Sequence, residues 1–414
     1  MKIEKITFGI GDRFSKEGDA QLLAIRQINE LGVRVFPVWN KSYREHKIVK
    51  TNQASVLNEA RNAVEKAKWS GSFYVDADHI GMETVDEFMD YSNFFTIDVA
   101  HFIGKQGKSV EKDDFIKRHL RYKGKLSIPG IEEEFTISEK YLMSAADKYL
   151  TAIQEVAKIY NYIVSKKGKD NFIAEVSMDE TDNAQTPIDL FFILAELKYH
   201  GVEVQTIAPK FTGLFAKGVD YIGDITRFAK EFEADIAVVL HATKALGMPE
   251  NLKLSVHSGS DKFSIYPVIK SALKKFNAGI HVKTAGTTWL EEIIGLAKAG
   301  GKGLEIAKQV YVRAMDRYEE LTGPYASVLK INPENLPEKK VVDSWSITEY
   351  VKALTHDQSC REYNPDFRQL IHVGYKIAVE MGDDFPLALD EFREVIAEQV
   401  RFNLLERHLK PLFL

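Results

Sequence analysis

Short β-forming runs alternate with amphipathic helical segments over the first three quarters of this chain of 414 residues. This alternation is typical of parallel strands, because each parallel neighbour is reached through a helical crossover. We count eight such runs, and eight parallel strands close a (β/α)8 barrel. The expected strands span residues 6–10, 33–39, 73–77, 94–100, 172–178, 202–208, 252–257 and 279–283. We therefore predict an α/β fold of the TIM-barrel type.

An open doubly wound sheet is the competing architecture for a chain of this kind. A dinucleotide-binding sheet would carry a Gly-rich phosphate turn after its first strand. The sequence GIGDRF, at the end of the first expected strand, lacks the G-x-G-x-x-G pattern. The sequence therefore favours the barrel and gives no indication of a nucleotide cofactor.

Two segments interrupt the strand–helix rhythm. Residues 104–147 are charged and rich in Gly and Lys, and they fall between the fourth and fifth expected strands. We interpret them as an insertion that forms a small subdomain or lid over the barrel mouth. From residue 322 the chain loses strand character, so residues 322–414 are expected to form a helical C-terminal extension packed on a barrel domain of residues 1–321.

Charge and cysteine content exclude several classes of protein. The chain has 55 Lys and Arg against 60 Asp and Glu, a formal net charge of -5, which gives no electrostatic reason to bind nucleic acid or an anionic membrane. The one cysteine, Cys360, cannot form an intrachain disulfide. There is no apolar run long enough to span a bilayer and no signal-peptide core at the N-terminus. We expect a cytoplasmic protein.

Several strand ends carry His, Asp, Glu or Lys. The runs are YVDADHI, IDVAH, EVSMDETD, SVHSGSD and HVKTAGTTW, which begin at residues 74, 97, 175, 255 and 281. In a barrel the carboxyl ends of the strands form the active-site face. Imidazole and carboxylate donors suit Mn²⁺, Ni²⁺, Zn²⁺ or Co²⁺, and a three-ligand site with open positions is typical of a catalytic metal. The sequence therefore predicts a divalent metal at the barrel mouth.

Among the histidines, His79 and His257 are the favoured ligands, although a capping role for His79 stays open. His281 is interpreted as a substrate contact, with metal binding as the alternative. Asp78 lies next to His79 and is the natural general base if the histidine holds the metal.

Acids and lysines at other strand ends are further candidates. Four acids crowd one strand end, and like charges at close range predict that one of them has a raised pKa and acts as an acid; they are Glu175, Asp179, Glu180 and Asp182. An acidic loop that caps the next helix is the alternative. Lys210 and Lys283 end strands and are expected to hold an anionic or hydroxyl-rich substrate.

Longer runs resemble the tagaturonate epimerase family. They are TIAPKFTG, KGVDYIGD, LKLSVHSGSDKFSIYP, HVKTAGTTWLEE and YNPDFRQLIHVGYKIA, together with the ending NLLERHLKPLFL. The resemblance is strong over residues 171–414 and weaker over the N-terminal third through DADHI.

The resemblance implies a metal-dependent isomerase that interconverts D-tagaturonate and D-fructuronate in hexuronate catabolism. It implies Asp78 as proton acceptor, and His79, Asp224 and His257 as metal ligands. It also implies a proton-donating acid in the DETD segment, for which we choose Glu180, with Asp182 and Glu175 as the alternatives. The expected partner is a small-molecule ketose or keto-uronate, with a homo-oligomer left open. The alternatives are a neutral ketose 4-epimerase acting on D-tagatose and D-fructose, and a class II aldolase-type lyase.

Overall fold

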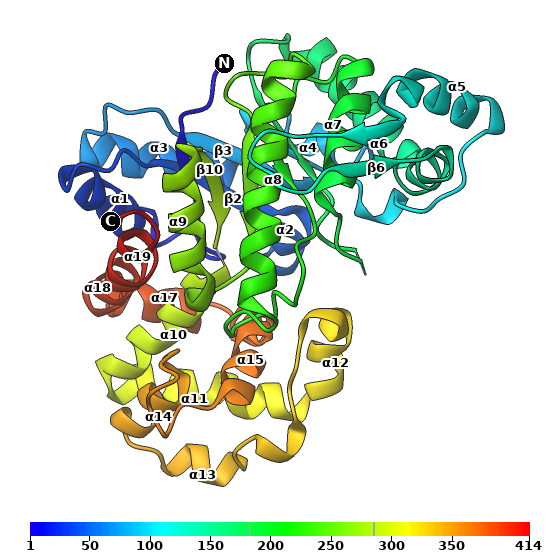
Figure 1. The fold of residues 1–414 in the computed structure, drawn as a ribbon. Helices are drawn as coiled ribbons and strands as arrows, with labels where there is room; N and C mark the ends of the chain where they lie inside the picture. The colour runs from blue at the N-terminus through cyan, green and yellow to red at the C-terminus, as the bar shows by residue number, and fades with distance from the viewer. Residues whose placement is uncertain (182, 285) are drawn as a thin grey trace.

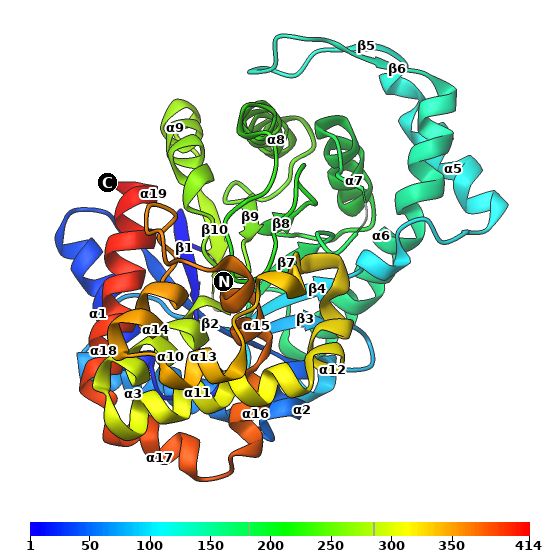
Figure 2. The same ribbon diagram turned by 90° about the horizontal axis from the view of Figure 1, so that it is seen from below.

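The computed structural model describes residues 1–181, 183–284 and 286–414, and its centre is a closed barrel of eight parallel strands. Figure 2 shows these strands arranged in a ring. In barrel order they are β1 (Ile6–Ile10), β10 (Ile280–Lys283), β9 (Lys253–His257), β8 (Thr206–Ala208), β7 (Ile173–Ser177), β4 (Phe94–Asp98), β3 (Tyr74–Ile80) and β2 (Phe36–Ser42). The predicted TIM-type barrel is confirmed.

The second strand lies later in the chain than residues 33–39. Val33 and Val35 instead close the turn after α1 (Gly18–Glu30). The Val33 amide donates to the carbonyl of Ile28 across 3.3 Å, and the Val35 amide donates to the side chain of Asn29 across 2.8 Å. These β-branched residues therefore serve the helix-to-strand connection, and the strand itself ends at the barrel mouth with Ser42.

Helices surround the barrel (Figure 1), and the last residues of the chain complete this layer. The surrounding helices are α1, α3 (Ala54–Ala67), α6 (Glu139–Lys167), α7 (Pro187–Tyr199), α8 (Ile225–Ala245) and α9 (Tyr266–Phe276). The segment η6 (Asn403–Leu409) packs on α1, and the adjoining α19 (Lys410–Phe413) packs on α9. Leu405, Leu409 and Leu412 are buried in the barrel's own core cluster. The C-terminus therefore fills the seam between β10 and β1.

A second apolar core lies beneath the carboxyl ends of the strands, in the lower half of Figure 1. Its helices are α10 (Gly286–Ala299), α11 (Gly301–Asp316), α12 (Tyr318–Thr322), α13 (Lys339–Ser344), α14 (Ile347–Leu354), α15 (Pro365–Val373), α16 (Tyr375–Glu380), α17 (Asp384–Glu391) and α18 (Arg393–Phe402). Trp289, Tyr311, Tyr350 and Phe367 are buried at its centre. This helical region therefore begins at α10, ahead of the expected boundary at residue 322.

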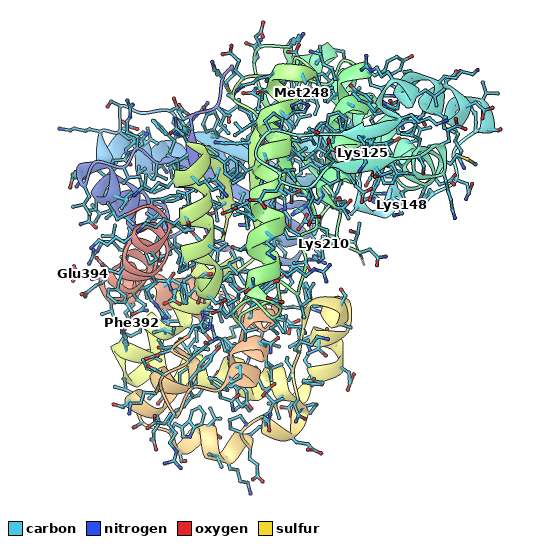
Figure 3. The ribbon with its side chains drawn as sticks, in the orientation of Figure 1. Lys125, Lys148, Lys210, Met248, Phe392 and Glu394 are labelled. Carbon is cyan, nitrogen blue, oxygen red and sulfur yellow. The ribbon has the colours of Figure 1, made fainter. Side chains whose placement is uncertain are left out.

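The insertion after β4 lies on the outside of the barrel. It contains α5 (Ser109–His119) and an antiparallel hairpin of β5 (Gly124–Leu126) and β6 (Phe135–Ile137). Nε2 of His119 lies 2.8 Å from a carboxylate oxygen of Glu196 on α7. Figure 3 places Lys125 of β5 in the upper part of the molecule, away from the helical region at the bottom. Among the described residues, none of the insertion lines the pocket at the mouth, so its expected role as a lid receives no support.

None of the helices in the described segments combines the length and the apolar character that a membrane span needs.

Candidate active site

A pocket of about 370 Å³ opens between the carboxyl ends of the strands and the helical region. Its lining combines strand-end residues with residues from α2 (Tyr43–Val49) and the C-terminal extension. Among the lining residues are Arg13, Arg44, Asp78, His79, Glu180, Lys217, His257, Lys283, Tyr325, His372 and Tyr375. A pocket on this face is where the barrel fold places its catalytic groups.

Three of the side chains at this face form a compact set of metal-type donors. His79, Asp179 and His257 each offer one ligand atom, and these atoms lie within 4.8 Å of one another. Nδ1 of His257 lies 3.1 Å from Oδ1 of Asp179, and the two imidazole rings are 5.2 Å apart between centroids. Two nitrogens and one oxygen are the donor set expected for a catalytic divalent cation such as Mn²⁺, Ni²⁺, Zn²⁺ or Co²⁺.

His79 reaches this set from an unusual backbone position. Its φ is 53°, in the left-handed region that side chains other than Gly seldom adopt. The pairing of β3 with β4 shifts register between Ala77 and Ile80, so the strand is irregular at the histidine, as in a β-bulge. Bulges and left-handed residues redirect side chains at functional sites. The irregular end of β3 therefore turns His79 toward His257.

Carboxylates surround the two histidines and favour a positive charge between them. Oε1 of Glu175 lies 2.8 Å from Nε2 of His257, and Oδ2 of Asp98 lies 3.6 Å from Nδ1 of His79. Burial alone would lower the pKa of His257, but Asp179 and Glu175 outweigh it and raise that pKa to about 9. When Glu175 accepts the Nε2 proton, the Nδ1 lone pair that faces Asp179 is left for a metal. The donor set therefore fits the predicted cation.

Lys283 is held by carboxylates at the base of the pocket. Its Nζ lies 2.7 Å from Asp76, 3.0 Å from Asp78 and 3.0 Å from Glu175. Burial raises the pKa of Asp76 to about 7, against the effect of the lysine. Burial would also raise the pKa of Asp78, but Lys283 and His79 hold it below its usual range, so Asp78 is ionised at neutral pH. Gly9 allows this arrangement, because a Cβ there would lie 3.0 Å from the Lys283 backbone.

Five of the site residues expected from the sequence lie in this pocket. They are Asp78, His79, Glu180, His257 and Lys283, of which Glu180 is exposed. Asp224 does not join them. It is exposed and caps α8, where its carboxylate accepts the amides of Thr226 at 2.8 Å and Arg227 at 3.1 Å. The carboxylate that lies beside the two histidines is that of Asp179, so the expected ligand role of Asp224 stays a prediction.

His281 and Lys210, the other two expected substrate contacts, lie away from the described lining of the pocket. His281 is buried inside the barrel, two residues below Lys283, and its Nδ1 lies 2.9 Å from the hydroxyl of Thr7. Burial lowers its pKa to about 3, so it is neutral. Lys210 is half-buried, and its backbone carbonyl accepts the amide of Gln185. Neither residue is among the described lining of the pocket.

The two described buried acids at the end of β7, Glu175 and Asp179, have lowered pKa values, whereas a raised pKa was expected at this strand end. Burial would raise the pKa of Glu175, but Lys283 and His257 lower it well below its usual range. The pKa of Asp179 is also lowered, because His257 outweighs its burial. Both groups are therefore ionised, and the expected raised pKa is not found in either. Asp182 lies outside the described residues.

Several pocket residues were missed from the sequence. Asp76 alternates with Asp78 along β3, so the two-residue period could have placed both on the inner face. Arg13, Arg44 and Lys217 come from three different loops or short helices, and Tyr325 and Tyr375 come from the C-terminal extension. No periodic signal marks such residues, since only the tertiary fold brings them together.

Comparison with known proteins gives consistent matches. The family model of UxaE, tagaturonate epimerase, matches residues 1–411. A tagaturonate/fructuronate epimerase of Thermotoga maritima is 33% identical over 386 residues, which cover 90% of this chain and 73% of that protein. The native crystal structure of the fructuronate-tagaturonate epimerase UxaE from Cohnella laeviribosi superposes with a TM-score of 0.81 at 26% identity, covering 100% of this chain and 82% of the other. A glycerol complex of the same protein gives a TM-score of 0.82 with the same identity and coverage.

Proposed function

Because the chain belongs to the tagaturonate epimerase family, we propose that it is an isomerase that interconverts D-tagaturonate and D-fructuronate. The observation that carries the proposal is the donor set of His79, Asp179 and His257, with the ionised Asp78 3.7 Å from His79. A Lewis acid with an adjacent proton acceptor is what the inversion of a hydroxyl-bearing carbon in a keto sugar requires.

The stereocentre that differs between the two substrates is β to the ketone. Simple enolisation acts on the α carbon, so it cannot invert this centre. Two routes are consistent with the pocket. In the first, the C4 hydroxyl loses its proton, the C3–C4 bond opens to an enediolate and an aldehyde, and the aldehyde rotates and re-adds through its other face. In the second, the hydrogen on C4 is removed as a proton on one face and a proton is returned on the other.

The donor set and its surrounding carboxylates define what the pocket supplies. His79, Asp179 and His257 would hold the divalent cation, which when bound would polarise the substrate ketone. Glu175 orients His257 through Nε2, and Ser177 donates its hydroxyl to Asp179. These contacts fix the donor atoms before any ligand arrives, which lowers the cost of assembling the site.

The proton carriers are assigned from position and charge. Asp78 accepts a proton in both routes, since it lines the pocket and is kept ionised by Lys283 across 3.0 Å. Glu180 is our candidate for the proton donor, because it lines the pocket and follows Asp179 directly. A neutral ketose such as D-tagatose carries the same ketone and C4 hydroxyl, so its epimerisation is the second candidate activity.

A chelation experiment tests the proposal. Enzyme treated with a chelator and restored with Mn²⁺, Ni²⁺, Zn²⁺ or Co²⁺ would be offered tagaturonate and tagatose in parallel. We expect metal-dependent turnover of tagaturonate that is faster than that of tagatose. A preference for tagatose would move the protein to the neutral ketoses, and release of cleaved fragments would indicate an aldolase. No conversion of either sugar with any metal would refute the epimerase.

A further inference from the structure

Three cationic side chains meet on one wall of the pocket. Arg13 follows β1, Arg44 lies in α2, and Lys217 lies in the loop between β8 and α8. The Arg44 guanidinium lies 4.8 Å and the Lys217 ammonium 5.2 Å from the centre of the same ring, that of Tyr325. The Arg13 guanidinium lies 4.4 Å from the ring centre of a second tyrosine, Tyr375. We call these three cations the cationic wall.

The two tyrosines join the cations into one group. The hydroxyl of Tyr325 lies 3.3 Å from that of Tyr375, and both residues belong to the helical C-terminal extension. The backbone amide of Lys217 donates to the carbonyl of Val328 across 2.9 Å, which fixes this loop against the same extension. A cation that lies over an aromatic face forms no hydrogen bond with the ring, so its N–H groups can still donate to another acceptor. The wall is therefore positioned by the extension.

The positive charge of this wall is only partly compensated. Arg13 lies 3.3 Å from Glu45, but within the described chain neither Arg44 nor Lys217 forms an ion pair or a side-chain hydrogen bond. Burial lowers the pKa of Lys217 and Arg44 lowers it further by repulsion, and the opposing attraction of Glu180 and Glu45 does not outweigh them. Like charges held together cost free energy, which a bound anion would offset.

Acids predominate around the metal-type donors. Asp78 lines the pocket, Asp179 and Glu175 contact His257, and the ammonium of Lys283 is already shared among Asp76, Asp78 and Glu175. A substrate carboxylate placed beside Lys283 would face these acids at close range. The surroundings of the metal-type donors and the cationic wall therefore differ in sign, and a ligand with a ketone at one end and a carboxylate at the other has one favourable orientation.

We propose that Lys217, Arg44 and Arg13 form the subsite that binds the carboxylate of a keto-uronate and that this subsite sets the preference over neutral ketoses. The inference rests on the proposed function, because it assigns the far end of the same substrate. Arg13 and Arg44 offer planar donor pairs that match a carboxylate, and Lys217 adds a point charge beside them. The proposed subsite also gives the C-terminal extension a role in substrate selection, since Tyr325 and Tyr375 of the extension position the cationic wall.

The test compares two sugars that differ in one group. Tagaturonate carries a carboxylate where tagatose carries a hydroxymethyl group, so the ratio of their kcat/KM values isolates this subsite. Lys217→Met should lower kcat/KM for tagaturonate about 10- to 100-fold, mainly through KM, because a charge-assisted contact is lost. The value for tagatose should stay within about threefold. Arg44→Met should act in the same direction, and Lys217→Arg should recover most of the loss.

Controls separate substrate binding from folding. Lys148→Met removes an exposed lysine on α6, labelled in Figure 3, and should leave both sugars unaffected. Thermal unfolding of each variant shows whether the fold is intact. An equal loss for both sugars, or an unchanged kcat/KM for tagaturonate in both Lys217→Met and Arg44→Met, would overturn the proposed subsite.

A binding measurement keeps this inference separate from the proposed activity. Calorimetric titration of tagaturonate and tagatose into the wild type and Lys217→Met needs no turnover. If the wild type converts neither sugar but binds tagaturonate through Lys217, the subsite stands and the epimerase assignment fails. If the wild type is active but Lys217→Met and Arg44→Met bind tagaturonate as tightly as it does, the activity stands and the subsite fails. Absence of tagaturonate binding to the wild type would overturn the subsite as well.

Discussion

The guanidinium of Arg368 donates to the carboxylate of Asp261 across 2.7 Å, with both side chains fully buried. Arg368 belongs to α15 of the extension, and Asp261 follows β9 four residues after the metal-type donor His257. The same carboxylate faces His356 at 3.1 Å and His408 at 3.0 Å. One buried acid therefore connects the barrel loop beside the donor set to three separate parts of the C-terminal region.

Removal of one partner from this pair should destabilise the protein strongly. Arg368→Met leaves the Asp261 carboxylate buried without its main counter-charge, and we expect a loss of about 3–5 kcal/mol in the free energy of unfolding. The double variant with Asp261→Asn should lose less than the sum of the two single losses, because the contact is shared. Denaturant unfolding measures all three.

Exposed Arg313 on α11 provides the matched control, since Arg313→Met removes a guanidinium that contacts Gln309 without an acidic partner. We expect a change within about 0.5 kcal/mol. An Arg368→Met protein as stable as this control would show that the extension is held by its apolar core alone.

The third metal donor is tested by comparing two aspartates. Asp179→Ala should lose the bound divalent cation, because its carboxylate lies with His79 and His257 inside a 4.8 Å set. Asp224→Ala should keep the cation and lose about 1 kcal/mol of stability, since it removes the N-cap of α8. Metal content after dialysis distinguishes them. The reverse pattern, with metal lost only from Asp224→Ala, would return Asp224 to the ligand set.

Asp78 should be needed for turnover but not for metal binding. Asp78→Asn keeps the shape of the side chain and its contact distance to Lys283, but it removes the proton acceptor. We expect kcat to fall by about 10²- to 10⁴-fold with the metal content unchanged. Steady-state kinetics and metal analysis on the same preparation check this. A metal-free Asp78→Asn protein would mean that Asp78 is a ligand.

The sequence was sufficient for the barrel, because alternation of strands and helices is a local property. His79, His257 and Lys283 could be found for the same reason: each ends an apolar run where a barrel strand must reach the mouth. The expected ligand role of Asp224 stays a prediction, because its place near the start of a helix also makes it a good N-cap, which is its observed contact. Sequence cannot decide between these two uses of one carboxylate.

The cationic wall could not be predicted, because its residues are far apart in the sequence and come together only in the folded chain. Arg13 and Lys217 are separated by 204 positions in the sequence, and Tyr375 belongs to an extension whose docking surface has no periodic signature. The packing of the C-terminal residues on the barrel between β10 and β1 could not be predicted either. The ending NLLERHLKPLFL shows helical periodicity, but this does not indicate which part of the barrel it covers. Such relationships follow from packing, and packing is not local.

Stability should rise with pH on the basic side, through Lys253 at the N-terminal end of the barrel. Burial lowers the pKa of Lys253 to about 7, and its ammonium donates to the carbonyl of Glu4 at 2.5 Å and the hydroxyl of Thr7 at 3.0 Å. Between pH 7 and about 10.5 the unfolded chain keeps a proton that the folded chain has released, so the free energy of unfolding increases with pH. Below pH 7 the cost of the buried charge is fully present. The effect is on the order of 1.4 kcal/mol for each unit of pKa shift.

Lys253→Met removes this titration, so we expect its curve of unfolding free energy against pH to be flatter than that of the wild type in this window. Lys262 is also buried with its pKa lowered to about 7, but it contributes equally to both proteins and cancels in their difference. Lys148→Met removes an exposed lysine and should give a difference that does not vary with pH. Parallel wild-type and Lys253→Met curves would show instead that Lys253 stays protonated in the folded barrel, held by the Glu4 carbonyl and Thr7.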